Sequence, residues 1–500
     1  MSNSSKTYPL SCIDFGNEAG DDISSEELLP MFVEQQITRK FLSDKNKFLL
    51  ATAKKGVGKS ALIKWLEAKI PCQHDAEKSI VISLKGSDLV RSSFGLTEKL
   101  TNPNDNIRDW MVRICTIINR NIGAHLKFAL DDDAISLVES SEIDGFKSRN
   151  IMSALCERFI KLLPKRLDHK KLPISNEIEL LKRMSKYPVW VLVDDLDATY
   201  QRTESENLEL STFFSACRRI AADMKGICIR ATMRTDVWAM IRRYDESLDK
   251  VSQYVTDITW NESDFRELLY KRIYNQLCDN NYTFHSPSYS VSEEEKQEYV
   301  INTIFENKFE WGDGERMPYK ILYTLSYHRP RWAIQLCKLA QEKALNDNRK
   351  TINKQDLDAI WGGYGLNRIS DIVAEHRHQC SRIEELVSGF RGAERKMTRE
   401  NLLQWIKNRI TNHLTVDIEG KSVRDPLKIA NFLYRIGFIV ARTDSEYYEH
   451  YDFSQMPDFL ESKTNNDFGV VWEIHPCYRE ALDIQKLNKF QRDQRNWKNK

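Results

Sequence analysis

The sequence predicts an α/β fold in which a parallel β-sheet is followed by a helical region and a smaller module of helices and strands. The loop AKKGVGKS, residues 53–60, lies between an apolar run and a helix-forming stretch. A second apolar run, VWVLV at residues 189–193, ends in the acidic sequence DDLD. From residue 261 onward, apolar residues recur mainly at helical spacing. Together these observations predict strands that end at one polar edge, where open parallel sheets bind ligands.

The chain has 500 residues, enough for several domains with their own cores. Hydrophobic residues make up 41% and charged residues 29%, a balance typical of globular proteins. We find no membrane-length apolar run and no signal or transit pattern, so we expect a cytoplasmic protein without a membrane partner. The ten cysteines are scattered without a CxxC pair, which argues against a disulfide framework or a zinc ribbon. A net charge of +1 neither requires nor excludes nucleic acid.

The loop that follows the predicted strand Phe48–Ala51 has the composition of a phosphate-binding loop. Its glycines leave room for backbone N–H groups to face a polyphosphate, and the next helix adds the positive end of its dipole. We expect Lys59 to reach the β- and γ-phosphates and the Ser60 hydroxyl to ligate Mg²⁺. Further nucleotide contacts are expected from Ala53, Lys55, Gly56, Val57, Gly58 and Ala61. Ala53 replaces the first glycine of the strict pattern, and the alternative interpretation is a turn that binds no ligand.

The run Val189–Val193 is predicted to be a strand buried on both faces of the sheet. The carboxylates that follow it then emerge at the ligand-binding edge. Asp194 is the candidate Mg²⁺ ligand, and Asp195 is placed to orient and deprotonate an attacking water. For Asp197 the alternative is a cap of the following turn. The competing interpretation of the whole segment is a core strand followed by an acidic turn.

Three more strands are predicted at residues 79–84, 226–232 and 254–260. A helix at Leu208–Met224 separates the acidic strand from the strand at 226–232, which indicates an extra strand in the sheet. This extra strand favours ATPases that carry their own catalytic acid over small-molecule kinases. At its tip, Thr232 and Arg234 are candidates to contact the γ-phosphate, and Arg234 is the one expected to act in catalysis.

Five segments are predicted along the chain. They are a polar lead-in at 1–30, a core at 31–260, a helical lid at 261–350, a helical linker with a winged-helix-like domain at 351–484, and a basic tail at 485–500. Residues 106–184 are too long for one crossover between strands, so we expect a helical insertion there. The acidic patch at 131–133 is expected to be a solvated loop. In the lid, Arg331 starts the last helix and is expected to close on the nucleotide, with Arg329 as the alternative.

The C-terminal module is predicted from a helix, a hairpin with a long wing and a closing helix. The helix is expected at Asp425–Ile439, an irregular wing at Val440–Glu461, a strand at Gly469–Ile474 and a short helix at Tyr478–Ile484. Such a module could bind DNA or protein. His376, His378 and Cys380 have a metal-like spacing, but only the first and third share a helix face, so we expect no metal site there.

Four segments carry a resemblance to a known family. AKKGVGKS, VWVLVDDLD, IRATMRTDVW and HRPRWAIQL, in this order, resemble the AAA+/STAND branch of P-loop ATPases. They are similar to orphan bacterial ATPases of anti-phage defence loci, whose core is similar to that of origin-recognition and NB-ARC proteins. The resemblance covers about residues 30–345 and, more loosely, the C-terminal module. It implies a P-loop NTPase sheet of the ASCE type, a Walker A loop, a Walker B strand, and Mg²⁺-dependent hydrolysis of ATP.

The resemblance implies an ATP-hydrolysing switch that forms a homo-oligomer and acts with a separate effector protein. Two alternatives stay open: a DNA-binding initiator or loader, and a nucleotide-binding scaffold without turnover. The scaffold is disfavoured because Lys59, Ser60, Asp194 and Asp195 are all present. For duplex DNA we expect only weak, salt-dependent binding, because basic surface is local.

Members of the resembled class commonly complete a neighbour's site with an arginine. Arg242 and Arg243, at the end of the helix after the strand with Thr232, are the candidates for this role. Arg218 and Arg219 are the fallback. The alternative is that Arg242 and Arg243 only pair with the carboxylates that follow them.

Overall fold

The computed structural model describes the chain in ranges separated by gaps. These are residues 9–18, 20–73, 79–89, 100–125, 178, 181, 188–198, 200, 203–224, 226–282, 292–312, 314–444, 448–453, 455–457, 459–461 and 470–484. Most of the expected insertion, including the acidic patch at 131–133, and the whole basic tail lie outside the described residues.

The chain divides into two compact units. The sheet unit comprises Gly16–Asn275 and Arg329–Arg331. The C-terminal unit comprises Met1–Phe15, Gln276–His328 and Trp332–Lys500. The two units are described separately below.

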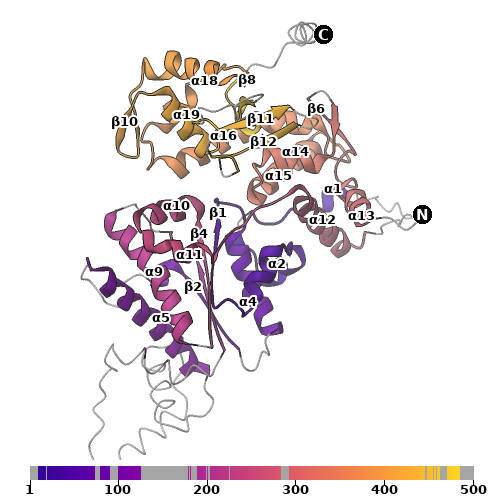
Figure 1. Cartoon of the computed structure of the whole chain (residues 1–500). Helices are drawn as coiled ribbons and strands as arrows, with labels where there is room; N and C mark the ends of the chain where they lie inside the picture. The colour runs from indigo at the N-terminus through magenta and orange to yellow at the C-terminus, as the bar shows by residue number, and fades with distance from the viewer. Residues whose placement is uncertain are drawn as a thin grey trace, which may run out of the picture. The chain divides into compact units, whose positions relative to one another are not determined.

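The sheet unit is built on five parallel strands. They are β1 (Phe48–Ala53), β2 (Ile80–Lys85), β3 (Val189–Asp194), β4 (Ile227–Arg234) and β5 (Val255–Asp257). Their order is β2-β3-β4-β1-β5, and every neighbouring pair is parallel. Because β4 lies between β1 and β3, the predicted extra strand is confirmed (Figure 1).

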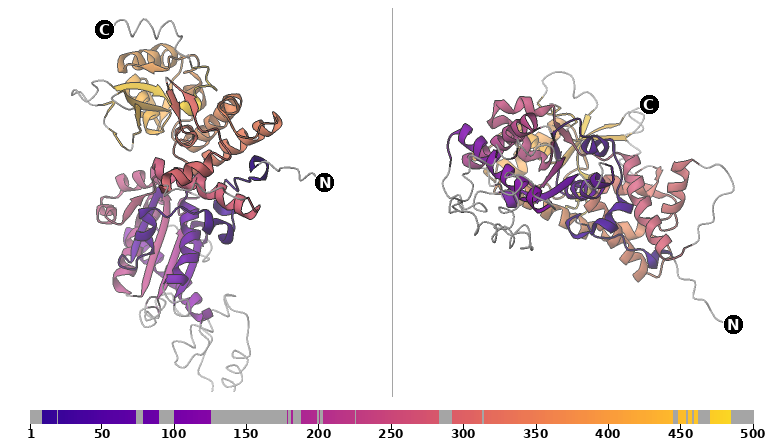
Figure 2. Two further views of the ribbon diagram at one scale, coloured as in Figure 1. Left: turned by 90° about the vertical axis from the view of Figure 1, so that its right-hand side faces the viewer. Right: turned by 90° about the horizontal axis from the view of Figure 1, so that it is seen from below.

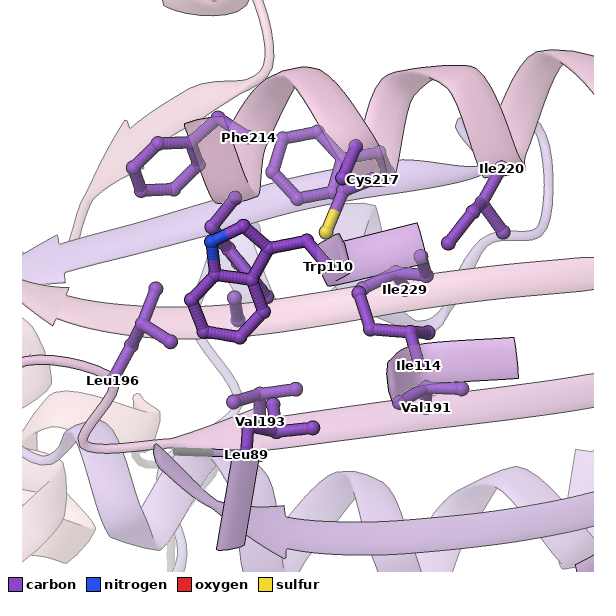
Figure 3. Packing of buried hydrophobic residues seen from close by; sticks show 14 of the residues in the cluster. Leu89, Trp110, Ile114, Val191, Val193, Leu196, Phe214, Cys217, Ile220 and Ile229 are labelled. Carbon is purple, nitrogen blue, oxygen red and sulfur yellow. The ribbon is translucent and has the colours of Figure 1, made fainter. Parts of the chain in front are cut away.

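Helices cover both faces of this sheet (Figure 1, Figure 2). One group consists of α5 (Pro103–His125), α9 (Glu204–Asp223) and α10 (Thr235–Tyr244), and the other of α2 (Ser25–Met31), α3 (Gln36–Leu42) and α4 (Lys59–Gln73). Val191 and Val193 of β3 pack with the first group, whereas Trp190 and Leu192 pack with α3 and α4. Successive strand side chains point to opposite faces, so the apolar run of β3 fills two cores. Figure 3 shows the first of these cores.

Shorter elements complete the sheet unit. They are η1 (Gly20–Asp22), η2 (Gly86–Leu89), η4 (Glu246–Leu248), α11 (Asp249–Ser252) and the start of α12 (Glu262–Asp279). A buried cation, Arg230 on β4, donates from Nε to the Phe41 carbonyl at 2.6 Å and from Nη2 to the Ser43 carbonyl at 2.7 Å. Burial lowers the pKa of Arg230 to about 10, which leaves it charged at neutral pH. Arg230 therefore ties the end of α3 to the centre of the sheet.

The expected polar lead-in has buried apolar residues among its described positions. Leu10 and Phe15 are buried in the C-terminal unit, and Ile23 and Leu28 are buried in the sheet unit. The Gln341 amide donates to the Leu10 carbonyl at 2.9 Å. A few apolar residues thus anchor this segment, although its average composition is polar.

The C-terminal unit consists mainly of helices. They are α1 (Pro9–Cys12), α13 (Glu293–Ile301), α14 (Pro318–Leu325), α15 (Pro330–Asn346, from Trp332 onward), α16 (Lys354–His376), α17 (Ile383–Ser388), α18 (Arg399–Ile406) with a π-helical end at Lys407–Thr411, α19 (Pro426–Arg435) and the 3₁₀ turn η7 (Pro476–Tyr478). The expected lid region also contains an antiparallel hairpin of β6 (Phe309–Trp311) and β7 (Gly314–Arg316), which sequence reasoning missed.

The last part of this unit contains more β-structure than predicted. Its strands are β8 (Lys396–Met397), β9 (Val416–Ile418), β10 (Lys421–Val423), β11 (Ile439–Asp444), β12 (Tyr448–Tyr451) and β13 (Val470–Ile474). β9 pairs with β10, and the other four form a sheet of order β12-β11-β13-β8, in the colours orange to yellow of Figure 2. The prediction of an irregular wing at Val440–Glu461 was wrong, because β11 gains strand partners on both sides. The predicted helix at Tyr478–Ile484 was wrong: the 3₁₀ turn η7 ends at Tyr478, and turns follow at residues 479–483.

A buried charge network joins three strands of this small sheet. Glu473 on β13 is fully buried and accepts from Arg479 Nη2 at 2.7 Å and from Arg442 Nη1 at 3.0 Å. His450 Nε2 lies 2.9 Å from the same carboxylate. Burial alone raises the pKa of the Glu473 carboxyl, but Arg479, His450 and Arg442 hold that pKa well below its ordinary value. Burial also lowers the pKa of His450, against the opposing effect of Glu473.

The strand order and the glycine-bearing loop after β1 define a P-loop NTPase fold of the ASCE type, with an extra strand between β1 and β3. Among the described residues, we find no helix that is both long and apolar enough to span a membrane.

Candidate functional site

The loop between β1 and α4 has backbone angles that require its glycines. Gly56 has φ +79° and Gly58 has φ +119°, a left-handed region that other residues rarely adopt. The Trp260 indole N–H donates to the Val57 carbonyl at 2.8 Å and supports the loop from outside. α4 begins at Lys59, so the unpaired N–H groups of its first turn follow the loop directly. This combination is an anion-binding geometry.

Lys59 is buried, with 8% of its surface exposed. Within the ranges that the structure describes, no carboxylate forms an ion pair with its ammonium group. A buried cation without a paired anion is costly unless a ligand supplies the negative charge. The two neighbouring site residues are less buried, since Ser60 is half-buried and Lys55 is exposed.

The Thr232 hydroxyl connects the Asp194 carboxylate to the backbone of Asp195 at the end of β3. Thr232 Oγ1 on β4 donates to Asp194 Oδ1 at 2.5 Å and accepts from the Asp195 backbone N–H at 3.2 Å. Asp194 is buried, and Asp195 is half-buried. Asp195 has φ +46°, an uncommon conformation for a residue other than glycine that is often found at functional sites. Thr232 therefore holds the acidic turn in place, and its contact with the γ-phosphate stays a prediction.

Arg234 is engaged with Asp197. Its Nε donates to Asp197 Oδ2 at 2.5 Å, and its backbone N–H donates to Asp197 Oδ1 at 3.2 Å. The Asp197 side chain is buried and the Arg234 side chain is about a quarter exposed. Arg234 is also the N-cap residue of α10. Asp197 thus holds the junction of β4 and α10, and contact between Arg234 and a phosphate stays a prediction.

Arg331 lies directly against the phosphate-binding loop. Its backbone N–H donates to the Gly56 carbonyl at 3.2 Å, and its Nε donates to the Glu18 carbonyl at 3.4 Å. A Cβ placed on Gly56 would lie 3.1 Å from the Arg331 Cβ. Arg331 therefore contacts the loop through its backbone N–H and the aliphatic part of its side chain. Arg329, the alternative, is buried.

The sheet register brings the expected residues to one edge. Ala51 of β1 pairs with Thr232, and Ala53 pairs with Arg234, while Asp194 ends the strand on the other side of β4. This edge also carries the loop, so all the expected nucleotide-contacting residues lie in the sheet unit. Their roles toward a nucleotide stay predictions.

Sequence reasoning missed two features of this edge. Gly86, the first residue of η2, passes so close to the acidic turn that no side chain fits. The segment around η1 packs on the first turn of α4: a Cβ on Gly20 would lie 3.1 Å from the Ala61 backbone nitrogen. Lys64 of α4 also donates to the Ile23 carbonyl at 2.7 Å. Only the glycines themselves could have pointed to these contacts.

The remaining candidates lie away from this edge. Arg242 and Arg243 are exposed in the last turn of α10, and Arg242 pairs with Asp249 at 3.6 Å rather than with the residues next to it. Of the fallback pair on α9, Arg219 is exposed. In the described part of the chain, no group of three or more His, Cys, Asp or Glu could hold a metal ion, and this includes the spacing at 376–380.

Comparison with known proteins identifies two similarities in sequence. Residues 263–373 match the family model of the FunZ-associated C-terminal helical domain. The chain is also 22% identical over 324 residues to the putative transposon gamma-delta 80.3 kDa protein of Escherichia coli strain K12. That match covers 63% of this chain and 43% of the relative, so the chain spans less than half the relative's length.

Among solved structures, similar chains include Cdc6p from Pyrobaculum aerophilum, with 11% identity, a TM-score of 0.34, and coverage of 92% of this chain and 96% of that one. The ORC2 protein of Aeropyrum pernix is similar in its ADPNP–ADP complexes, with 9% identity, a TM-score of 0.38 and 91% coverage of both chains. Its ADP form gives 9% identity, a TM-score of 0.31, and coverage of 92% of this chain and 93% of that one. With TM-scores this low, the assignment of a P-loop NTPase fold rests on the strand order and the loop of this chain.

Proposed function

We propose that this chain binds ATP at the loop between β1 and α4 and hydrolyses it at the acidic turn after β3. The observation that carries the proposal is Lys59, a buried ammonium group without a carboxylate partner in the described chain, at the start of a helix that follows two left-handed glycines. A polyphosphate supplies the missing negative charge. The Thr232 bridge to Asp194 and Asp195 supports the choice of the reacting edge.

Each residue has a distinct role in this proposal. Lys59 and the backbone N–H groups of the loop hold the β- and γ-phosphates. Asp195 orients a water molecule and accepts its proton while the water oxygen bonds to the γ-phosphorus. The bond from that phosphorus to the bridging oxygen breaks, and ADP leaves with the electron pair. Arg331, whose backbone touches the loop, is the proposed contact from the following helix.

The donor set at this edge fits Mg²⁺. The Ser60 hydroxyl and the Asp194 carboxylate are hard oxygen ligands of the kind that Mg²⁺ uses together with phosphates and waters. Asp194 also keeps one oxygen on the Thr232 hydroxyl, which orients the carboxylate. When bound, the ion would neutralise charge on the phosphates.

Release of phosphate from ATP tests this proposal. We expect hydrolysis by the wild-type chain with Mg²⁺, loss of hydrolysis with EDTA, and strongly reduced hydrolysis by the variant Asp194→Asn. Asp223→Asn is the matched control, because Asp223 is exposed and ends α9. Hydrolysis by Asp194→Asn at the wild-type rate would refute the assignment of the edge.

We further propose that ATP turnover drives a switch, and that the chain acts as a homo-oligomer with a separate effector protein. An anti-phage role rests on the resemblance of its motifs alone. The relative described as a transposon protein fits a chain encoded near mobile DNA. Arg242 and Arg243 are proposed to complete a neighbour's site, since both are exposed and the pair of Arg242 with Asp249 is solvated. Specific activity that rises with protein concentration would support this, and constant activity would oppose it.

The C-terminal module supports a second, weaker role. We infer a winged-helix-like arrangement from α17, β8, α18, α19, β11 and β13, with β11 and β13 antiparallel and β8 beside β13. Strands β9 and β10 are inserted between α18 and α19, and β12 follows β11. We propose that this module binds duplex DNA weakly and with steep salt dependence. Tight binding at physiological salt would instead favour the DNA-loader alternative.

A further inference from the structure

The backbone at Gly86 passes unusually close to the acidic turn. Lys85, the last residue of β2, pairs in register with Asp194 of β3. One residue later, a Cβ built on Gly86 would lie 2.6 Å from the Asp195 carbonyl oxygen and 2.6 Å from the Leu196 Cα. Real Cβ atoms do not approach backbone atoms so closely, so any side chain at position 86 must displace one of the two segments. Space is the only obstacle, because the φ of Gly86 lies outside the left-handed region.

The start of η2 and the Asp195–Leu196 turn cannot easily move away from each other. Leu196 on the turn and Leu89 at the end of η2 are buried in the same hydrophobic core, where they lie near Val193 (Figure 3). The Arg113 guanidinium donates to the Leu89 carbonyl and holds the end of η2. Because both flanks are anchored, we expect strain from an added methyl group to reach the turn itself.

The turn that would be displaced carries the proposed catalytic carboxylate. The Asp195 carbonyl, which lies against Gly86, accepts from the Ala198 N–H at 3.0 Å. The Asp195 N–H donates to Thr232 Oγ1 at 3.2 Å, and the Leu196 N–H donates to the Thr232 carbonyl at 3.4 Å. The left-handed φ of Asp195 depends on these contacts, since the conformation is unfavourable by itself.

We propose that Gly86 is a positioning residue: its missing side chain lets the Asp195–Leu196 turn close against β2, and so aims the Asp195 carboxylate at the reacting water. The inference rests on the proposed ATP hydrolysis at this edge. Gly86 touches neither nucleotide nor water in this account. A displacement of about 1 Å at a catalytic group lowers the rate of the chemical step strongly, while binding energy at the distant loop is kept.

The variant Gly86→Ala tests the proposal. We expect kcat for ATP hydrolysis to fall at least about tenfold, while the Kd for ATP stays within about twofold of the wild-type value, because Lys59 and the loop are untouched. Gly363→Ala is the matched control: no atom lies within 4 Å of the position of its Cβ, and it should leave both values unchanged.

A double-mutant cycle separates positioning from general damage to the fold. In the background Asp195→Asn, the carboxylate is already lost, so adding Gly86→Ala should lower the residual rate by less than about twofold. Asn is chosen because it tolerates the left-handed conformation, which leaves the backbone of the turn unchanged.

A second pair of variants covers the case in which Gly86→Ala does not fold. Leu196→Ala removes the anchor of the turn, and Ile114→Ala removes a side chain of the same core from α5 (Figure 3). Both should lower the melting temperature, but only Leu196→Ala should lower kcat by about tenfold or more.

The outcomes for the inference and for the proposed function differ. Wild-type kcat in Gly86→Ala, or equal kcat losses in Leu196→Ala and Ile114→Ala, would overturn the role of Gly86 while hydrolysis stands. Additive losses in the double-mutant cycle would also overturn it. Absence of hydrolysis by the wild-type chain would instead refute the proposed function.

Discussion

Two buried charges of opposite sign, Lys59 and Glu473, differ in whether oppositely charged side chains surround them. Lys59 in the sheet unit is buried without a carboxylate partner in the described residues. Glu473 in the C-terminal unit is buried with Arg442, Arg479 and His450 around its carboxylate. A buried charge that is paired with opposite charges holds strands together, whereas a buried charge without such a partner needs a ligand. Burial alone therefore does not mark a functional residue, but burial together with a missing partner does.

Removal of the carboxylate charge from the acidic turn should have the largest effect on activity. The variant Asp195→Asn should lower ATP turnover by roughly 10²–10⁴-fold, the usual contribution of a general base, with ATP affinity kept. Phosphate release and calorimetric titration measure the two quantities. Turnover at the parent rate would reduce Asp195 to a structural residue of the left-handed turn.

For the paired charge of Glu473 we expect the opposite pattern, a loss of stability without a loss of ATP binding. Glu473→Gln should destabilise the C-terminal unit by about 3–5 kcal/mol, because Arg442 and Arg479 are left without their buried anion. Urea unfolding measures the loss. ATP affinity should be unchanged, and the comparison between the two charges fails if Glu473→Gln weakens ATP binding while stability is kept.

Lowering the pH should also weaken the charge network around Glu473, with a smaller loss of stability than in Glu473→Gln. His450 and Glu473 both have pKa values below the ordinary 6.5 and 4.5, so the folded state binds fewer protons than the unfolded state. Stability is therefore complete above those ordinary values and falls as pH decreases, first below about 6.5 for His450 and then below about 4.5 for Glu473. Melting temperatures between pH 8 and pH 4 check the prediction. In Glu473→Gln the decline below pH 4.5 should be flatter, and an identical profile would contradict the assignment.

The sheet edge could be predicted from the sequence because short stretches of consecutive residues determine it. The run Val189–Val193 fills two cores, so its apolar pattern and the carboxylates that follow it identify a central strand. The glycines of the loop identify a turn with positive φ, and Gly56 and Gly58 have it. These features depend on neighbours in the chain, which a sequence shows directly.

What the sequence could not predict depends on partners distant in the chain. Strand β11 forms because β12 and β13 pair with it, although its own segment appeared irregular. Gly86 approaches the acidic turn because β2 pairs with β3, whose residues lie more than a hundred positions further along the chain. The pair of Arg234 with Asp197 likewise arises only when β4 follows the acidic turn. Such contacts require the strand order, which no local pattern encodes.

The unpaired charge of Lys59 is tested most directly by calorimetric titration of ATP into the wild-type chain and two variants. Lys59→Ala should bind ATP at least about tenfold more weakly, since a hydrogen bond to a charged group contributes about 1.5–3 kcal/mol. Lys69→Ala is the matched control on the same helix, because its side chain is 40% exposed and its distance to Glu34 is 4.0 Å, and it should bind like the wild type. Without nucleotide, Lys59→Ala should melt no earlier than the wild type, because the lysine has no anionic partner to lose. Equal ATP affinity of the wild-type chain and Lys59→Ala would contradict the account.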